Sequence, residues 1–154
     1  MGLDMYLNKK SYVKNWNHQT PEEKHKVIVK KAGKVRKDIK PERISYITEQ
    51  VGYWRKFNAL HGWFVENCQG GKDECQESYV STEKLKELLE TLKAVVADKN
   101  NATKVLPSRG GFFFGGTDYD EYYFKEVKET IKLLEGLLKE SEEVECDFYY
   151  QASW

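Results

Sequence analysis

The sequence contains few of the residues that define disulfide-rich, metal-binding or membrane-spanning proteins. Its 154 residues include three cysteines and three histidines, and neither Cys-x-x-Cys nor His-x-x-x-His spacing occurs, which argues against a zinc site. No apolar run approaches the roughly 20 residues that a membrane-spanning helix requires. The odd number of cysteines and the lack of a secretory signal pattern lead us to expect a cytosolic protein with free thiols and no membrane partner.

Recognisable catalytic motifs are also missing. The chain has no Gly-x-Ser-x-Gly, no Walker loop and no Gly-x-Gly-x-x-Gly. Asp118, Asp120 and Glu121 could ligate a hard cation, but acidic residues also suit the start of a helix, which is the simpler interpretation. An acid–base pair, such as His61 with Glu49, would depend on the fold bringing its members together. We therefore predict no catalytic residue, no cofactor and no metal ligand, and we favour binding over catalysis.

Charge is balanced over the whole chain but unevenly distributed along it. Residues 1–77 carry 15 lysines and arginines against 10 aspartates and glutamates, whereas residues 78–154 carry 10 against 15. The basic excess is concentrated between Lys24 and Arg43. Such a run can attract phosphates, although a solvated surface is the simpler interpretation.

Alternating apolar residues predict a strand near each end of the chain. Leu3, Met5 and Leu7 alternate with polar residues, and residues 143–154 alternate in the same way. We expect these two strands to be neighbours in one small sheet. A strand over Val27–Val29, followed by a turn at Ala32 and Gly33, suggests a small basic hairpin between them in the sequence, and a helix that continues through Lys37 is the alternative.

Helical spacing of apolar residues predicts three main helices, over about residues 41–66, 82–98 and 119–140. Residues 112–114 are a plausible short strand. Strands and helices do not alternate as repeated βαβ units, so the predicted class is α+β. We expect one domain over residues 1–154, with the small sheet packed against the three helices.

The most informative segment runs from Arg109 to Gly116, where two glycine pairs bracket three phenylalanines. Arg109 beside Gly110 and Gly111 supplies a forked cation and accessible backbone donors that suit a phosphate. Phe113 could stack on a nucleobase. The alternative is a buried strand whose phenylalanines fill the core. We predict Arg109, Gly110, Gly111 and Phe113 as ligand-binding residues.

Two further sets of residues are candidates for the same site. On the predicted helix over residues 41–66, Trp54, Asn58 and His61 would share one face, with Arg55 and Lys56 beside them. That line suits a polar planar ligand, but it also suits a helix edge under a loop, with His61 as a hydrogen-bonded, partly buried histidine. The paired terminal strands would place a second set on one face of the sheet, either in a pocket or on ordinary solvent-exposed surface. This second set comprises Asp4, Tyr6, Tyr149 and Gln151.

Five sequence blocks are distinctive as a set and run the length of the chain. They are MGLDMYL at residues 1–7, VGYWRK at 51–56, GFFFG at 111–115, YDEYY at 119–123 and YYQASW at 149–154. Together they resemble a family of small proteins encoded by bacteriophages and prophages. The resemblance implies a protein that works in the cytoplasm of a bacterial host cell as an accessory or host-interaction factor. It transfers no activity and no site residue.

These features lead to three functional expectations. The first is a non-enzymatic phage-type accessory protein that binds a small anionic, nucleotide-like ligand, which in a phage setting could sequester a host defence signal. The second is a protein–protein inhibitor or adaptor that acts on a host bacterial protein. The third is a nucleotide-processing enzyme. Direct nucleic-acid binding ranks below all three, and the sequence leaves the oligomeric state open, including a homo-oligomer.

Overall fold

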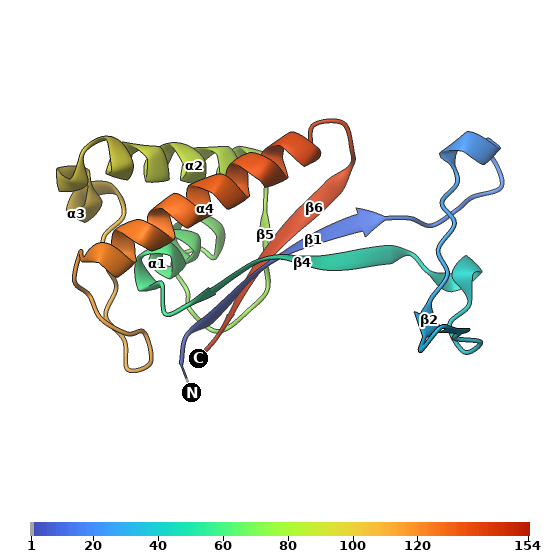
Figure 1. The fold of residues 1–154 in the computed structure, drawn as a ribbon, viewed down its shortest axis with the longest axis horizontal. Helices are drawn as coiled ribbons and strands as arrows, with labels where there is room; N and C mark the ends of the chain where they lie inside the picture. Colours follow the sequence, from blue (N-terminus) through green and yellow to red (C-terminus); the bar gives the residue numbers. More distant parts are fainter. Residues whose placement is uncertain (1) are drawn as a thin grey trace.

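The computed structural model describes residues 2–154 and shows a four-stranded antiparallel sheet with its helices on one face (Figure 1). The strand order is β4-β1-β6-β5. These strands are β1 (Asp4–Tyr12), β4 (Tyr46–Arg55), β5 (Ser78–Val80) and β6 (Cys146–Ser153), and a separate hairpin consists of β2 (Lys30–Lys31) and β3 (Lys34–Val35). The helices are α1 (Asn58–Cys68), α2 (Thr82–Ala97), α3 (Ala102–Val105) and α4 (Glu121–Glu140). The predicted α+β class is confirmed.

The two terminal strands pair as the sequence predicts. β1 and β6 are antiparallel neighbours in a register that joins Asp4 to Ser153 at one end and Ser11 to Cys146 at the other. β4 lies on the other side of β1, where Asp4 is opposite Arg55. The beginning of β1 and the ends of β4 and β6 therefore meet at one edge of the molecule, which we call the terminal end of the sheet.

The core lies between the sheet and its helices. Leu3, Met5 and Leu7 point inward and are fully buried, as the predicted alternation requires. Helices α2 and α4 pack on each other and cover this face, and burial of each large apolar side chain contributes about 1.5–3 kcal/mol. The indole N–H of Trp54 donates to Thr130 Oγ1 at 2.9 Å, which docks β4 onto α4. Within residues 2–154, no helix has the length and apolar content to cross a membrane.

The predicted helix over residues 41–66 is wrong in its first half. Residues Tyr46–Arg55 form β4, and α1 begins only at Asn58. Apolar and aromatic side chains in this stretch fit a helical stripe, but β-branched and aromatic residues also suit a strand, and pairing with β1 decides between them. Trp54 therefore lies on a strand and does not share a helix face with Asn58 and His61. The other two helices form close to their predicted bounds.

The predicted strand at residues 112–114 does not form, because the segment turns between its glycines. Its three phenylalanines separate: Phe114 is buried against the core, Phe113 is half-buried, and Phe112 is 94% exposed. The predicted strand over Val27–Val29 is also absent. The hairpin around Ala32 and Gly33 does form, with its strands shifted toward the turn.

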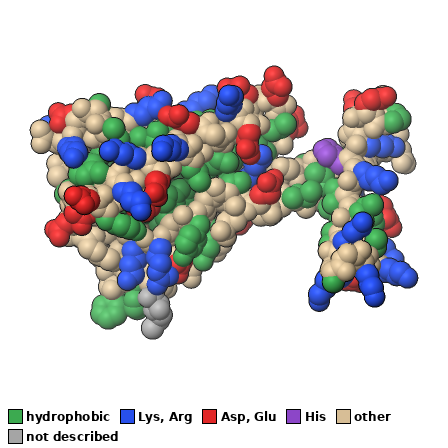
Figure 2. All heavy atoms as spheres, in the orientation of Figure 1, with side chains coloured by type: hydrophobic (Ala, Val, Ile, Leu, Met, Phe, Trp, Pro, Cys, Tyr) green, Lys and Arg blue, Asp and Glu red, His purple; other side chains and the backbone are tan. Residues whose placement is uncertain are grey.

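Residues 13–45 form an extension that we call the arm; the rest of the chain is the body. Figure 2 shows the arm as a separate lobe that a narrow neck joins to the body. Val13 is its one buried residue, and no arm residue belongs to the hydrophobic core. The arm carries ten lysines and arginines against four aspartates and glutamates, so it has a net charge of +6.

Candidate ligand-binding cleft

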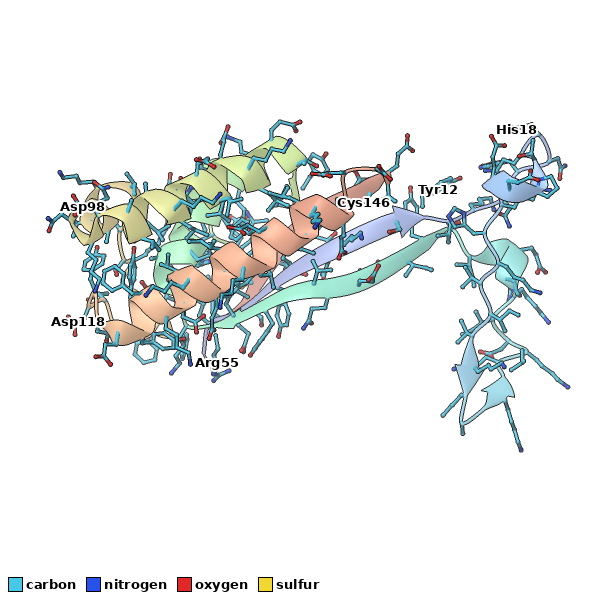
Figure 3. The ribbon with its side chains drawn as sticks, turned by 45° about the horizontal axis from the view of Figure 1, so that its top comes forward. Tyr12, His18, Arg55, Asp98, Asp118 and Cys146 are labelled. Atoms are coloured by element: carbon cyan, nitrogen blue, oxygen red, sulfur yellow. The ribbon has the colours of Figure 1, made fainter. Side chains whose placement is uncertain are left out.

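A cleft of about 330 Å³ lies at the terminal end of the sheet, where β4 leads into α1 and the segment after α3 crosses in front. Figure 3 places Arg55 and Asp118 at this end of the molecule, with Tyr12 at the opposite end of the sheet. We call this hollow the end cleft. Its lining consists of Arg55, Lys56, Phe57, Asn58, Ser108, Gly115, Gly116, Asp118, Asp120, Tyr122 and Tyr123.

Asn58, the first residue of α1, holds the wall of the end cleft in place. Its buried amide Nδ2 donates to the carbonyl oxygens of Phe114 at 3.0 Å and Gly116 at 2.7 Å. Its Oδ1 accepts from the backbone N–H of Arg109 at 2.9 Å. One side chain therefore fixes both ends of the glycine-rich segment. Asn58 is a positioning residue, because these bonds occupy its amide.

Close backbone packing explains one of the glycines. Gly115 has φ +83°, and a Cβ atom there would lie 3.1 Å from the Cβ of Lys56. Lys56 itself has φ +56°, in the left-handed region, and its N–H donates to the Leu3 carbonyl at 2.8 Å. A non-glycine residue with positive φ stores strain and often marks a functional site. Here the strain turns the chain from β4 into α1 and brings the Lys56 side chain to the cleft.

The N-terminus of α1 lacks the cap that the other long helices have. Ser81 caps α2 by accepting from Lys84 N–H, and Asp120 caps α4 by accepting from Tyr123 N–H. At α1 the N-cap position is Phe57, no side chain accepts there, and the first turn has no acidic residue. Within residues 2–154 the first-turn N–H groups of residues 58–60 have no hydrogen-bond acceptor, although these residues are buried. A buried, uncapped helix start is ready to receive an anion.

Charges at the rim of the end cleft are fixed by a small network on the sheet. Arg55 Nη1 lies 2.8 Å from Asp4 Oδ1, and the Tyr53 hydroxyl donates to the same oxygen at 2.5 Å. The hydrogen bond from Tyr53, followed by that from Arg55, lowers the pKa of Asp4, which therefore stays ionised. The Tyr122 hydroxyl donates to the Arg55 carbonyl at 2.7 Å, which ties α4 to the end of β4. About half of the Arg55 side chain remains exposed to solvent.

Arg109 lies on the other side of the glycine-rich segment, where it borders a second cavity of about 300 Å³. Arg109 Nη1 is 3.5 Å from Glu66 Oε1, and Asp73 also lines this cavity. The end cleft also holds two carboxylates, Asp118 and Asp120, but within residues 2–154 no helix start contributes to the lining of the second cavity, which is the main difference between the two sites. The remaining lining residues are Gly110, Gly111, Phe112, Phe113, Phe114 and Trp154.

His61 is the centre of a buried hydrogen-bonded chain and does not face either cavity. Its Nδ1 lies 2.7 Å from the Tyr150 hydroxyl and its Nε2 lies 2.8 Å from Asp73 Oδ2. Trp154 Nε1 donates to the other oxygen of Asp73 at 3.0 Å. A neutral imidazole that donates from Nε2 to Asp73 and accepts at Nδ1 from the Tyr150 hydroxyl gives both ring nitrogens a hydrogen-bond partner. Burial lowers the pKa of His61 and the contact with Asp73 opposes that shift, so the ring is neutral at pH 7.

The predicted site residues thus fall into separate places. Arg55 and Asn58 line the end cleft, and Asp4 pairs with Arg55 at its rim. Trp54 and His61 are buried in the core. The second cavity is lined by four of the remaining candidates: Arg109, Gly110, Gly111 and Phe113. The helix-free face of the sheet carries the other three: Tyr6, Tyr149 and Gln151.

Sequence reasoning missed several residues of the end cleft. Lys56 directly follows Arg55 and flanks the predicted helix face, but it is not among the predicted ligand-binding residues. Gly115 and Gly116 form the second of the two glycine pairs, but nothing in the sequence shows that they face Lys56 rather than Arg109. Asp118 and Tyr122 become neighbours of Arg55 only through the fold. Across residues 2–154 no cluster of three or more histidine, cysteine, aspartate or glutamate side chains is arranged to hold a metal ion.

Comparison with known proteins gives no relative from which a function could be transferred. No family model matches the chain, and neither the curated proteins nor the solved structures contain a match.

Proposed function

We propose that the protein is a non-enzymatic accessory protein of phage type that binds a small anionic, nucleotide-like ligand in the end cleft. The uncapped start of α1, next to the cations of Arg55 and Lys56, is the observation that supports this proposal most strongly. Backbone N–H groups at a helix start, together with flexible cations, are a recurrent way to hold a phosphate. In an infected cell, capture of a nucleotide signal would sequester a host defence messenger.

The cleft offers a distinct contact for each part of such a ligand. A phosphate would accept from the first-turn N–H groups of α1 and pair with Lys56 and Arg55. Asp118, which also lines the cleft, would accept from a sugar hydroxyl or an amino group, since a carboxylate is a pure acceptor. The Tyr122 ring provides an apolar surface for a planar base. No histidine or cysteine lines the cleft, so its chemistry supports binding better than it supports catalysis.

Native mass spectrometry of gently purified protein, followed by denaturation to identify any released molecule, tests the proposal directly. A stoichiometric nucleotide-like mass is the expected result. In parallel, a panel of nucleotides should raise the melting temperature, because a ligand at 100 times its Kd stabilises the folded state by about 2.7 kcal/mol. A clean apo mass, together with no thermal shift across the panel, would reject the proposal.

Three matched substitutions locate the ligand. Lys56→Met removes a cation from the end cleft, Arg109→Met removes one from the second cavity, and Lys125→Met removes one from the exposed surface of α4. We expect Lys56→Met alone to abolish the thermal shift. If Arg109→Met abolishes it and Lys56→Met does not, the ligand lies in the second cavity and the end-cleft assignment is wrong.

A second candidate function, binding to a host protein, is favoured by Phe112. This ring is 94% exposed at the tip of a glycine-flanked turn and packs edge-on against the neighbouring Phe113 ring, at 4.7 Å between centroids. An exposed aromatic side chain is a frequent anchor in protein interfaces. Phe112→Ser should leave the folded protein intact while removing any partner that wild-type protein retains in a pull-down from bacterial extract. Retention of the same partner by Phe112→Ser would exclude this anchor.

A further inference from the structure

The arm carries an unbalanced positive charge that its own body does not neutralise. Its net charge is +6, whereas the whole chain has a net charge of zero, so the body carries −6. Figure 2 shows the basic side chains of the arm on a lobe that stands away from the body. The opposite charges of one chain are therefore held apart by its own shape.

The tip of the arm concentrates this charge in an unfavourable way. In the β2–β3 hairpin Lys31 is directly opposite Lys34, and Lys30 is next to this pair. Like charges directly opposite each other destabilise a strand pair. In the part of the chain that the structure describes, none of these three lysines has an ion-pair partner. An anionic surface on another molecule would relieve this repulsion.

The body presents a matching acidic surface at the root of the arm. The turn from α4 to β6 carries Glu142, Glu143 and Glu145, all exposed, and no ion pair within residues 2–154 involves them. This turn leads into Cys146, which pairs with Ser11 next to the last residue of β1. The acidic turn therefore lies where the arm leaves the sheet, and the lysine-rich tip lies at the far end of the arm (Figure 1).

This arrangement is self-complementary under a two-fold axis. If two arms lie side by side and antiparallel, the tip of each reaches the root of the other, and each lysine cluster meets an acidic turn. An isologous interface has this property: if residue i of one subunit contacts residue j of the other, then residue j of the first also contacts residue i of the second. A single chain does not make the same contact, because Figure 1 shows the hairpin at the lower end of the arm and the acidic turn at the top of the body, on the other side of the neck.

Exposed apolar side chains follow the same path and would supply the hydrophobic part of the interface. They lie at the root, along the arm and on the acidic turn: Tyr12, Tyr46, Trp16, Ile28, Val35 and Val144. The Tyr12 and Tyr46 rings pack edge-on at 5.2 Å between centroids, which makes a rigid aromatic pair at the root. Aromatic side chains with a polar rim are typical of stable protein interfaces.

We infer that the arm is a dimerisation element, and that its partner is a second copy of this chain bound arm to arm, with the lysine-rich tip on the acidic turn. The inference does not depend on the proposed ligand, because the end cleft lies at the other end of the sheet. The dimer should weaken as salt is raised, since its specificity rests on exposed charges.

Sedimentation and light scattering of the full chain, over nanomolar to high micromolar concentrations and at low and high salt, measure the association. Two triple charge reversals test the contact: K30E/K31E/K34E at the tip and E142K/E143K/E145K on the turn. Each variant alone should dimerise at least tenfold more weakly, since each dimer would place like charges together. A 1:1 mixture of the two should restore association, because every tip then meets a turn of opposite sign.

A matched control is K125E/K128E/K132E, which reverses three lysines on the exposed side of α4 and should leave the dimer constant unchanged. Circular dichroism of each variant checks that the fold is retained. A wild-type monomer at every concentration would overturn the inference, whether or not the arm then binds nucleic acid or a host protein. A dimer that neither triple variant weakens, or variants whose mixture stays monomeric, would overturn it as well.

Discussion

The two ends of the β1–β4 ribbon differ in what surrounds them. At the terminal end, β6 and the helices flank the two strands, and Leu3, Met5 and Trp54 are buried. At the other end the same strands continue into the arm, where Val13 is the one buried residue. One continuous pair of strands is therefore packed in the core at one end and exposed at the other. Local stability follows the packing of side chains rather than strand pairing alone.

Similar hydrogen bonds contribute differently to the free energy of unfolding at the two ends. In the arm, Asn15 makes a reciprocal pair with the backbone of His25, at 2.7 and 2.8 Å, in an exposed position. In the body, Asn58 makes three bonds to the glycine-rich segment in a buried position. Water can replace the lost partner in the first case, whereas in the second it does not reach the buried Phe114 carbonyl.

Asn58→Ala should lower the free energy of unfolding by about 2–3 kcal/mol, because it leaves the buried Phe114 carbonyl without a partner and removes two part-buried bonds, to the Gly116 carbonyl and the Arg109 N–H. Asn15→Ala is the control in the arm and should cost less than about 1 kcal/mol. Chemical denaturation monitored by circular dichroism measures both values. Equal losses would show that the arm is as firmly packed as the body.

Acid should destabilise the body through His61. The pKa of His61 in the folded state lies below the ordinary value, so the unfolded state binds a proton more readily. The free energy of unfolding is therefore highest above about pH 6.5 and falls as the pH decreases, by at most about 1.4 kcal/mol per pH unit for one group. Denaturation at pH 7.5 and 5.5 should show a smaller loss for His61→Gln than for wild type. His18→Gln, on the exposed arm (Figure 3), should retain the wild-type loss. Identical pH dependence in all three proteins would contradict the buried neutral histidine.

Gly115→Ala should cost about 1–2 kcal/mol, because φ is +83° and the new methyl group would meet Lys56. The adjacent Gly116→Ala adds a methyl group with nothing within 4 Å and should stay within about 0.5 kcal/mol of wild type. Thermal unfolding separates the two. A larger effect at Gly116 would mean that the segment passes Lys56 differently.

Replacement of residues 14–44 by Asn-Gly should have the smallest effect on the body. Val13 N–H already donates to the Ser45 carbonyl at 2.9 Å, so a two-residue turn can close the ribbon there. We expect the melting temperature of the body to change little, as measured at low concentration. A large loss of stability, or a failure to fold, would show that the arm is part of the folding unit.

The sequence predicts those parts of the fold in which one pattern has one interpretation. Alternation around Leu3 and Met5 predicts β1, and the leucine spacing of α2 predicts its length. Residues 46–55 fit both a strand and a helix, and only the pairing partner β1 decides, which a single sequence does not reveal.

The candidate site is harder to predict from the sequence than the fold. Arg55 and Asn58 were predicted, but on a helix face that does not exist, and Lys56 was given only a flanking position there. The positive φ of Lys56 brings its side chain to the end cleft, and a lysine in the sequence does not predict a positive φ. The uncapped start of α1 is visible in the sequence only once its first residue is known.

The distribution of the four tryptophans makes the molecule its own optical probe. Trp16 is the one tryptophan of the arm and is 46% exposed, whereas Trp54 and Trp63 are buried in the body and Trp154 borders the second cavity. Fluorescence quenching by a dissolved ion should therefore report first on Trp16 and Trp154, and a single Trp154→Phe change would isolate the arm signal. Shielding of Trp16 at rising protein concentration would then register arm contact, while the emission of Trp54 and Trp63 follows the folding of the body.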